Sequence, residues 1–258
     1  MNSGLPVGVF DSGVGGLSVL SALTAILPHE DYIYLSDAAN APYGNKTHEQ
    51  VASLSLKNTE TLLSFGCKAI VVACNTATAA AVDLLRASYP GTVIIGIEPA
   101  LKPAFAAGCR RVAVLATPRT VSEDRLKTLI SRLSREYGAE ARAVGCAGLA
   151  GMIEKRSLTD AYFEDLFGRE GLKNSFDGIV LGCTHYSFAA ETIRRVSGGL
   201  PVFDGAEGTA RHTKNMLESR GLLNLKTEKG SVGFTGDAEG AARFWEEVAL
   251  KLPRRTDT

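Results

Sequence analysis

The chain has 258 residues, of which 45% are hydrophobic and 22% are charged, so it has enough apolar surface to bury a core. Its 28 Lys and Arg residues balance its 28 Asp and Glu residues, so no net charge attracts nucleic acid or an anionic membrane. The longest apolar runs, such as residues 69–74, are too short to span a bilayer, and the first residues lack the pattern of a signal peptide. We therefore expect a soluble cytoplasmic protein that binds neither nucleic acid nor membrane.

Short apolar runs rich in β-branched residues alternate with longer amphipathic stretches, which predicts an α/β fold with mainly parallel sheets. In the first half we expect strands at residues 7–10, 32–35, 69–73 and 93–97, and helices at 17–27, 48–65 and 77–88. In the second half we expect strands at 112–116, 141–144, 178–181 and 202–203, and helices at 122–137 and 188–196. Gly66 and Gly138 stand where helix C-caps are expected.

Polar residues follow the expected strands at matching places in the two halves. Ser12 and Cys74 are 62 positions apart, and Thr117 and Cys183 are 66 apart. This spacing indicates two similar units, each with its polar residues where ligands bind in open α/β sheets. We place the first domain at residues 1–98 plus 209–258 and the second at residues 99–208. The final segment is expected to pack back onto the first unit.

Two of the five cysteines occupy equivalent places in the two units. Cys74 and Cys183 each follow a buried apolar strand and precede small polar residues, a context that stabilises a thiolate at a helix start. Such a pair suits 1,1-proton transfer, with one thiol on either side of a substrate. A disulfide between them is the rival interpretation, which a reducing cytoplasm disfavours. The odd number of cysteines and the lack of CxxC spacing argue against a structural zinc site, and Cys67, Cys109 and Cys146 look structural.

A glycine-rich turn at residues 11–16 and a histidine beside the second thiol are the other chemical signals. Asp11 could orient or deprotonate a thiol or bind an ammonium group, or it could simply cap a helix. A dinucleotide site is disfavoured because Ser18 replaces the third glycine of that fingerprint and Asp11 would repel a pyrophosphate. His185 lies two residues from Cys183, close enough to tune that thiol. The histidines at 29, 48 and 212 lack polar neighbours in the sequence and are expected at the surface.

Four motifs together resemble those of glutamate racemases, within the wider aspartate/glutamate racemase family. They lie at residues 11–16 (DSGVGG), 41–44 (APYG), 73–77 (ACNTA) and 182–186 (GCTHY), in the order and spacing of that family. The resemblance implies two pseudo-symmetric three-layer α/β domains with the active site in the cleft between them. It also implies interconversion of L- and D-glutamate without cofactor or metal, which supplies D-glutamate for bacterial peptidoglycan. Homodimers are common in the family, so a homodimer is the assembly that the resemblance suggests.

The resemblance also assigns roles to matching positions. Cys74 would deprotonate D-glutamate with help from Asp11, and Cys183 would deprotonate L-glutamate with help from His185. The implied substrate contacts are Asp11, Ser12, Tyr43, Gly44, Asn75, Thr76, Thr184 and His185, with Thr117 and Thr120 as weaker candidates. Asp37 and Glu154 fall where the family carries acidic residues near the site.

The chain departs from the family pattern at Asn40, where Arg is usual, and at Ala147 and Ser187, where Pro is usual. None of these changes removes a thiol, so we expect them to affect loop stiffness, oligomer contacts or turnover. The chain also lacks the N-terminal extension with which some members respond to a peptidoglycan precursor, and we expect no such activation.

Other classes of protein stay open at this point. An aspartate or hydantoin racemase would share both thiols and differ in its pocket. A non-catalytic two-domain amino-acid-binding protein would need neither thiol. A decarboxylase of the same superfamily keeps only one cysteine of the pair, and a thiol hydrolase would need a single Cys–His pair.

Overall fold

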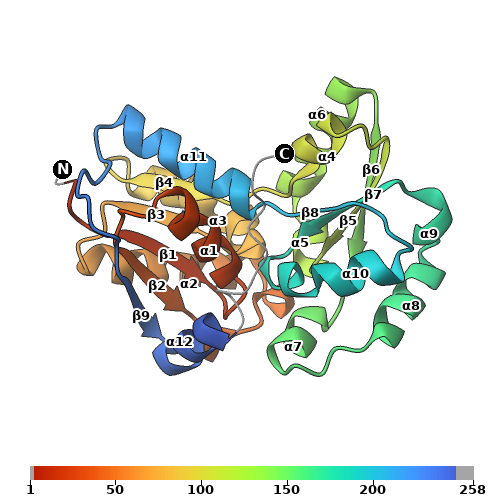
Figure 1. Cartoon of the computed structure of the whole chain (residues 1–258), viewed down its shortest axis with the longest axis horizontal. Helices are drawn as coiled ribbons and strands as arrows, with labels where there is room; N and C mark the ends of the chain where they lie inside the picture. Colours follow the sequence, from red (N-terminus) through yellow and green to blue (C-terminus); the bar gives the residue numbers. More distant parts are fainter. Residues whose placement is uncertain (1–2, 248–258) are drawn as a thin grey trace.

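Two parallel β-sheets organise the chain, as Figure 1 shows. The computed structural model describes residues 3–247. The first sheet has the order β4 (Val93–Gly96), β3 (Ala69–Val72), β1 (Val7–Asp11), β2 (Tyr32–Ser36) and β9 (Val232–Gly236). The second has the order β6 (Glu140–Gly145), β5 (Arg111–Ala116), β7 (Gly178–Gly182) and β8 (Val202–Phe203). All neighbouring strands are parallel, which confirms the predicted α/β class.

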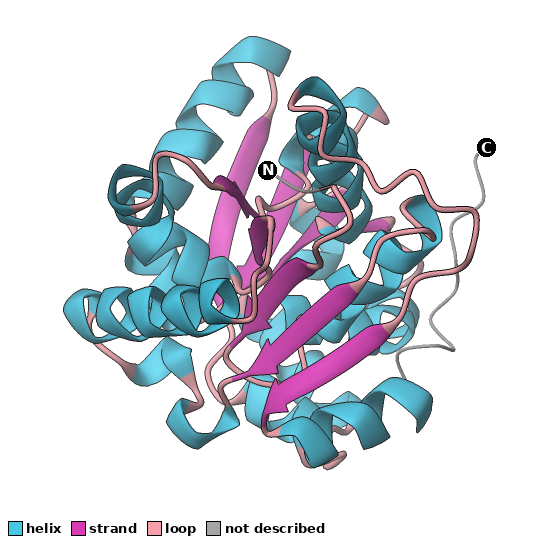
Figure 2. Cartoon of the chain, turned by 90° about the vertical axis from the view of Figure 1, so that its left-hand side faces the viewer, coloured by secondary structure: helices cyan, strands magenta, loops and turns pink. Residues whose placement is uncertain are grey.

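Helices cover both faces of each sheet, and Figure 2 shows them on either side of the strands. The first sheet packs against α1 (Leu17–Ile26), α2 (His48–Ser64), α3 (Asn75–Ser88), α11 (Ala206–Ser219) and α12 (Ala238–Glu247). The second is accompanied by α4 (Leu101–Ala106), α5 (Pro118–Ser122), α6 (Asp124–Tyr137), α7 (Leu149–Glu154), α8 (Asp160–Arg169), α9 (Leu172–Ser175) and α10 (Ala190–Val196). We call the first sheet with its helices the first lobe and the second sheet with its helices the second lobe. Each lobe buries two apolar clusters, one on either face of its sheet.

The predicted elements are found with small corrections. Each of the eight expected strands forms, and its ends differ from the prediction by one residue at most. The expected helix at 122–137 is wrong in its first turn: Glu123 has extended backbone angles (φ −72°, ψ 136°) and separates α5 from α6. The expected helix at 188–196 starts later, because Thr184–Ala189 forms a 3-10 helix, η3, ahead of α10.

The last part of the described chain returns to the first lobe. There β9 pairs with β2, and α11 packs against α1. The return loop is fixed by Glu30, whose carboxylate accepts the Asn224 N–H (2.8 Å) and pairs with the buried Lys68 ammonium. The proposed domain limits at 98/99 and 208/209 stay a prediction; α11 begins at Ala206, and residues 1–2 and 248–258 lie outside the described residues.

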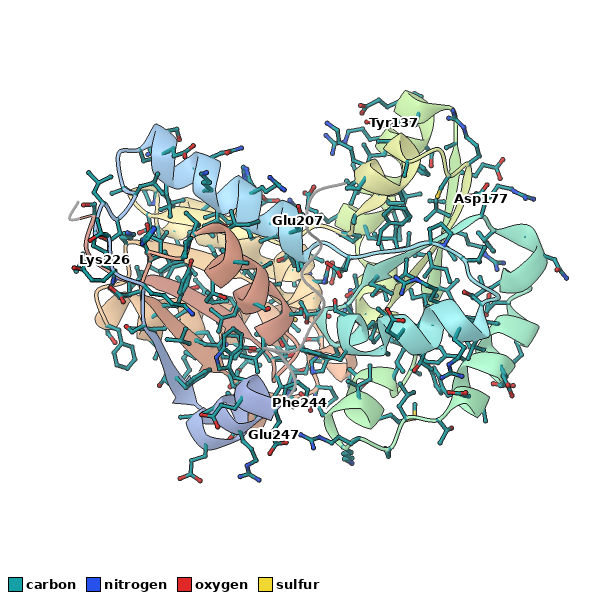
Figure 3. All side chains as sticks on the ribbon, viewed as in Figure 1. Tyr137, Asp177, Glu207, Lys226, Phe244 and Glu247 are labelled. Atoms are coloured by element: carbon teal, nitrogen blue, oxygen red, sulfur yellow. The ribbon has the colours of Figure 1, made fainter. Side chains whose placement is uncertain are left out.

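The two lobes also touch through α12, where Figure 3 labels Phe244 and Glu247. The Phe244 ring meets the Phe188 ring of η3 edge to face, with centroids 5.0 Å apart, and Arg156 of the second lobe pairs with Glu247. Within residues 3–247, no helix is long and apolar enough to cross a membrane.

Candidate active site

A cavity of about 400 Å³ lies between the lobes, where the chain leaves β1 and β3 of one sheet and β5 and β7 of the other. Its volume is in the range of small-molecule sites. The cavity is lined by eleven of the residues expected from the sequence: Ser12, Tyr43, Gly44, Cys74, Asn75, Thr76, Thr117, Glu154, Cys183, Thr184 and His185. The other three expected residues, Asp11, Asp37 and Thr120, do not line it, but each is one hydrogen bond from a residue that does.

Cys74 follows β3 and is the N-cap of α3, so its side chain lies at the positive end of a 14-residue helix. Its Sγ accepts the Ala77 N–H (3.5 Å) and lies 3.9 Å from Ser12 Oγ. Burial and the charge of Asp11 nevertheless raise the pKa of the Cys74 thiol to about 12, against the lowering effect of those two hydrogen bonds. Without a ligand, this thiol is therefore protonated at neutral pH.

Cys183 follows β7 and precedes η3, and its thiol caps no helix. Instead, its Sγ lies 3.9 Å from Nδ1 of His185, whose Nε2 is 2.7 Å from Glu154 Oε1. Burial by itself would lower the pKa of His185, but the contacts with Cys183 and Glu154 raise it well above its ordinary value. Burial acts to raise the pKa of Glu154, yet the hydrogen bond and charge of His185 lower it overall. The imidazolium–carboxylate pair therefore places a positive charge beside this second thiol.

Asp11 is fully buried and connects the lobes rather than facing the cavity. Its Oδ1 accepts the Gly13 N–H (3.0 Å), and its Oδ2 accepts the Thr184 hydroxyl (2.9 Å) from the second lobe. Burial raises the pKa of Asp11, although the charge of His185 and these hydrogen bonds oppose the rise.

The glycines of the 11–16 turn allow the lobes to approach this closely. A Cβ on Gly13 would lie 2.1 Å from Glu154 Oε1, and a Cβ on Gly15 would lie 2.3 Å from His185 Nδ1. No side chain fits at such distances without moving the second thiol's partners. The turn therefore supports the Cys183 side of the cavity, although it belongs to the lobe of Cys74.

Tyr43 lines the cavity with its hydroxyl directed into a polar cluster behind the wall. That hydroxyl donates to Asp37 Oδ2 and accepts from Asn58 Nδ2 (2.9 Å). Asp37 also accepts from Asn40, one of the departures from the family pattern, at 2.8 Å. Asp37 thus holds the turn that carries Tyr43 and Gly44 and is placed to position that turn.

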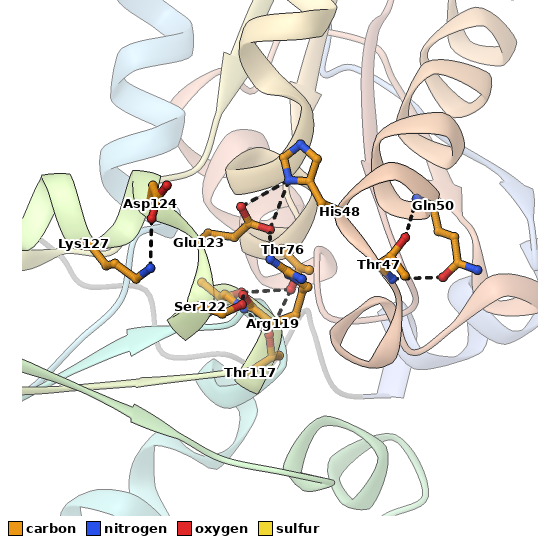
Figure 4. Close-up of polar contacts among 11 residues, drawn as sticks. Thr47, His48, Gln50, Thr76, Thr117, Arg119, Ser122, Glu123, Asp124 and Lys127 are labelled. Atoms are coloured by element: carbon orange, nitrogen blue, oxygen red, sulfur yellow. Dashed lines mark hydrogen bonds and ion pairs between the residues drawn. The ribbon is translucent and has the colours of Figure 1, made fainter.

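Three threonine hydroxyls join α3 to α5 across the lobes, as Figure 4 shows in part. Thr76 Oγ1 lies 3.2 Å from Thr117 Oγ1 and 3.0 Å from Thr120 Oγ1. Next to them, His48 Nδ1 of α2 lies 3.2 Å from Glu123, which also pairs with Arg119 at 2.8 Å. His48 was expected only as a surface residue; its partner is 75 positions away and could not be read from its neighbours.

Asn75 is the polar side chain of the cavity wall that the described chain leaves unsatisfied. It is only 5% exposed, and neither its Oδ1 nor its Nδ2 has a hydrogen-bond partner among residues 3–247. A buried amide without partners is costly, so it is suited to a polar ligand. Asn75 also borders a second hollow of about 720 Å³ between α3 and α6, which contains neither thiol.

Sequence reasoning did not assign several residues to the cavity or its support, among them Cys146, Lys155 and Asn58. Cys146, expected to be structural, also lines the wall, and burial raises the pKa of its thiol to about 12. Lys155 lines the wall beside Glu154. Asn58 supports Tyr43 from α2. The sequence holds no spacing signal for Lys155 or Asn58, whereas Cys146 follows a predicted strand as the other two thiols do.

Two α/β lobes enclose one cavity, and each lobe contributes to its wall a cysteine that follows a central strand. A family model for Asp/Glu/Hydantoin racemases matches residues 15–213. The chain belongs to this family and is therefore an isomerase.

Individual relatives extend this match over most of the chain. The glutamate racemase of Clostridium botulinum is 43% identical over 232 residues, covering 88% of this chain and 89% of that protein. The structure of Francisella tularensis glutamate racemase in complex with D-glutamate superposes with a TM-score of 0.81 at 25% identity, over 95% of both chains. Escherichia coli glutamate racemase, in complex with L-glutamate and the activator UDP-MurNAc-Ala, gives a TM-score of 0.80 at 27% identity over 94% of both. These matches confirm the expected family and its two-domain fold.

Proposed function

We propose that this protein interconverts L- and D-glutamate without a cofactor, using Cys74 and Cys183 as two opposed acid–base groups. The observation that carries the proposal is that these two thiols, from equivalent strands of separate sheets, line one cavity of small-molecule size. The substrate assignment is supported by relatives that were solved with D-glutamate and with L-glutamate.

The proposed reaction removes the α-proton from one face of the substrate and delivers a proton to the opposite face. In the D-to-L direction, the Cys74 thiolate removes the α-proton, and the electron pair of the broken C–H bond delocalises into the α-carboxylate. The Cys183 thiol then gives its proton to the opposite face of the same carbon. The protein ends with a Cys74 thiol and a Cys183 thiolate, which is the form that starts the L-to-D direction.

We propose that the substrate forms the hydrogen bonds that the Asn75 amide does not form with the described chain. The free amide of Asn75 offers both a donor and an acceptor to the substrate's carboxylate and ammonium groups. The hydroxyls of Ser12 and Thr76 and the backbone beside Gly44 complete the contacts on this side. An ammonium group bound near Cys74 would favour its thiolate and bring its pKa down from about 12.

The biological setting completes the proposal. We assign the protein to the supply of D-glutamate for bacterial peptidoglycan, and to the cytoplasm, where reducing conditions keep thiols free. All five cysteines are free thiols in this structure. The homodimer suggested by the family resemblance stays a prediction, which analytical ultracentrifugation would test.

The experiment is racemisation in D₂O without added cofactor. Starting from L-glutamate, the D-glutamate first formed should carry deuterium at Cα while the remaining L-glutamate stays protonated, because a separate thiol serves each face. Proton NMR and optical rotation would follow both, with L-aspartate as a parallel substrate. Turnover of aspartate alone would keep the mechanism and replace the substrate. If folded and reduced protein exchanged the α-proton of neither amino acid, the proposed racemase activity would be rejected in favour of a non-catalytic amino-acid-binding protein.

A further inference from the structure

Lys155 gives the cavity a charge that neither the sequence motifs nor the proposed reaction uses. It is the C-cap residue of α7, its N–H donates to Gly151 O (3.0 Å), and its side chain is exposed. Only three charged side chains of the described chain line the cavity: Glu154, Lys155 and His185. An exposed residue that also lines the cavity lies at its mouth.

The charges of these three side chains do not cancel. Glu154 and His185 pair at 2.7 Å, and Glu154 Oε1 also accepts the Val14 N–H (3.3 Å), so this carboxylate is already engaged. Among the side chains that the structure describes, none forms an ion pair or hydrogen bond with the ammonium group of Lys155. The mouth of the cavity therefore has one uncompensated positive charge.

We propose that Lys155 is a specificity-determining residue that favours amino acids with a second carboxylate by attracting their net negative charge to the cavity. The inference rests on the proposed function. At neutral pH glutamate has two carboxylates and one ammonium group, a net charge of −1, whereas glutamine is neutral overall. Electrostatic attraction scales with the ligand's net charge. Lys155 therefore favours the binding of glutamate and leaves the binding of glutamine almost unchanged.

The size of the effect follows from a single charge at the edge of a solvated cavity. Removing the charge should lower kcat/KM for glutamate about threefold at low ionic strength, and reversing it about tenfold. The attraction is screened over roughly 30 Å at 0.01 M salt and roughly 8 Å at 0.15 M, so the differences should shrink as salt is added. The rate of proton transfer in the bound complex should not change, so kcat should stay near the wild-type value.

The test is a charge series on the full chain: Lys155→Arg, Lys155→Gln and Lys155→Glu, with kcat and KM measured for L- and D-glutamate at low and high salt. Lys102→Gln is the matched control, because Lys102 is exposed on α4 and does not line the cavity. At low salt we expect kcat/KM to be about the same with Lys and Arg, lower with Gln and lowest with Glu, and we expect the four values to converge at high salt. Inhibition by L-glutamine should be the same in all variants.

A structural role for Lys155 would give a different pattern. Equal losses in the Gln and Glu variants, losses that persist at high salt, or weaker glutamine binding would overturn the proposal. If the wild-type protein does not racemise glutamate, the proposed function fails instead. If it does and the series shows no ordering by charge, only the role of Lys155 fails.

Discussion

The two halves of the cavity present the same residue in different electrostatic surroundings. Cys74 is the N-cap of a long helix and accepts a backbone N–H, with a buried carboxylate nearby. Cys183 precedes a 3-10 helix and caps nothing, but it lies beside a histidine held by a carboxylate. Duplicated topology therefore places both thiols, while unrelated neighbours set their chemistry.

This difference teaches how one site can serve two mirror-image substrates. In the proposed reaction, a thiolate at Cys74 would depend on helix amides and on the substrate's own ammonium group, whereas a thiolate at Cys183 would depend on a protonated imidazole. Because the equilibrium constant for racemisation is one, kcat/KM must be the same in both directions. The asymmetry of the halves can appear only in the separate values of kcat and KM and in their pH dependence.

The largest expected effect comes from removing either thiol. Cys74→Ser and Cys183→Ser should each lower kcat/KM by about 10³-fold or more in both directions, because a serine hydroxyl is a far weaker acid–base group. In D₂O, Cys183→Ser should still exchange the α-proton of D-glutamate, and Cys74→Ser that of L-glutamate. Cys109→Ser, at a buried thiol that does not line the cavity, is the control. Exchange with the opposite enantiomer in each variant would reverse the assignment of the two faces.

The next effect should come from the contact between the lobes at Gly15. Gly15→Ala would place a Cβ 2.3 Å from His185 Nδ1 and 2.6 Å from Thr184 Oγ1. We expect a loss of about 1–3 kcal/mol in the free energy of unfolding and a lower kcat, because His185 must move from Cys183. Urea titration and steady-state kinetics measure both. Gly91→Ala, with no atom within 4 Å of its Cβ, should be nearly neutral, and equal behaviour of the two variants would contradict this close packing.

A smaller effect is expected on the pH dependence of kcat/KM when the Cys183 side of the cavity is changed. The contact with Cys183 and the hydrogen bond to Glu154 both raise the pKa of His185, so with Glu154→Gln the imidazolium should be lost at a lower pH than in the wild type. We expect kcat/KM to fall about tenfold near neutral pH and its decline on the alkaline side to begin at lower pH. If the pH–rate profile of Glu154→Gln lay at the same pH as that of the wild type, Glu154 would not control the pKa of His185.

The ion pair between His185 and Glu154 should also make the free energy of unfolding depend on pH. The His185 pKa is raised, so its contribution is complete below the ordinary value of 6.5 and is lost as the pH rises through the folded-state pKa. The Glu154 pKa is lowered, so its contribution is present above the ordinary value of 4.5 and is lost as the pH falls through its folded-state pKa. The wild type should therefore exceed Glu154→Gln in free energy of unfolding, measured by urea titration, by the largest amount between pH 4.5 and pH 6.5. A difference that stays constant across pH would contradict this prediction.

The smallest effect is expected at His48, on the side of Cys74. Its side chain is 46% exposed, so its contact with Glu123 is screened by water. His48→Gln should cost about 0.5 kcal/mol or less in the free energy of unfolding, and kcat/KM should change little. Thermal unfolding in parallel with Lys102→Gln would measure it. A loss as large as that of Gly15→Ala would mean that this contact, too, holds the lobes together.

Much of the fold could be predicted because apolar periodicity reports on burial. The predicted strands β1, β3 and β7 are apolar runs buried on both faces, as central strands of parallel sheets are, whereas the edge strand β6 is only partly buried. Strand β9 gave no such signal, since it is a partly exposed edge strand with two glycines among its five residues. The division between α5 and α6 was missed because Glu123 is a good helix former, and its extended backbone and its contact with His48, 75 positions away, leave no local signal.

For the candidate site, the sequence by itself determined which residues stand at strand ends, since a strand's side chains and its following loop are local properties. Together with the family resemblance, which supplied Tyr43, Gly44 and Glu154, this gave eleven expected residues that line one cavity. Only the tertiary structure decided which of them face the cavity and which stand behind it, as Asp11 and Asp37 do. It alone placed Lys155 at the mouth and left the Asn75 amide unpartnered. The contact between Asp11 and Thr184 depends on how two separate sheets approach each other, and a contact between residues 173 positions apart leaves no periodic trace in the chain.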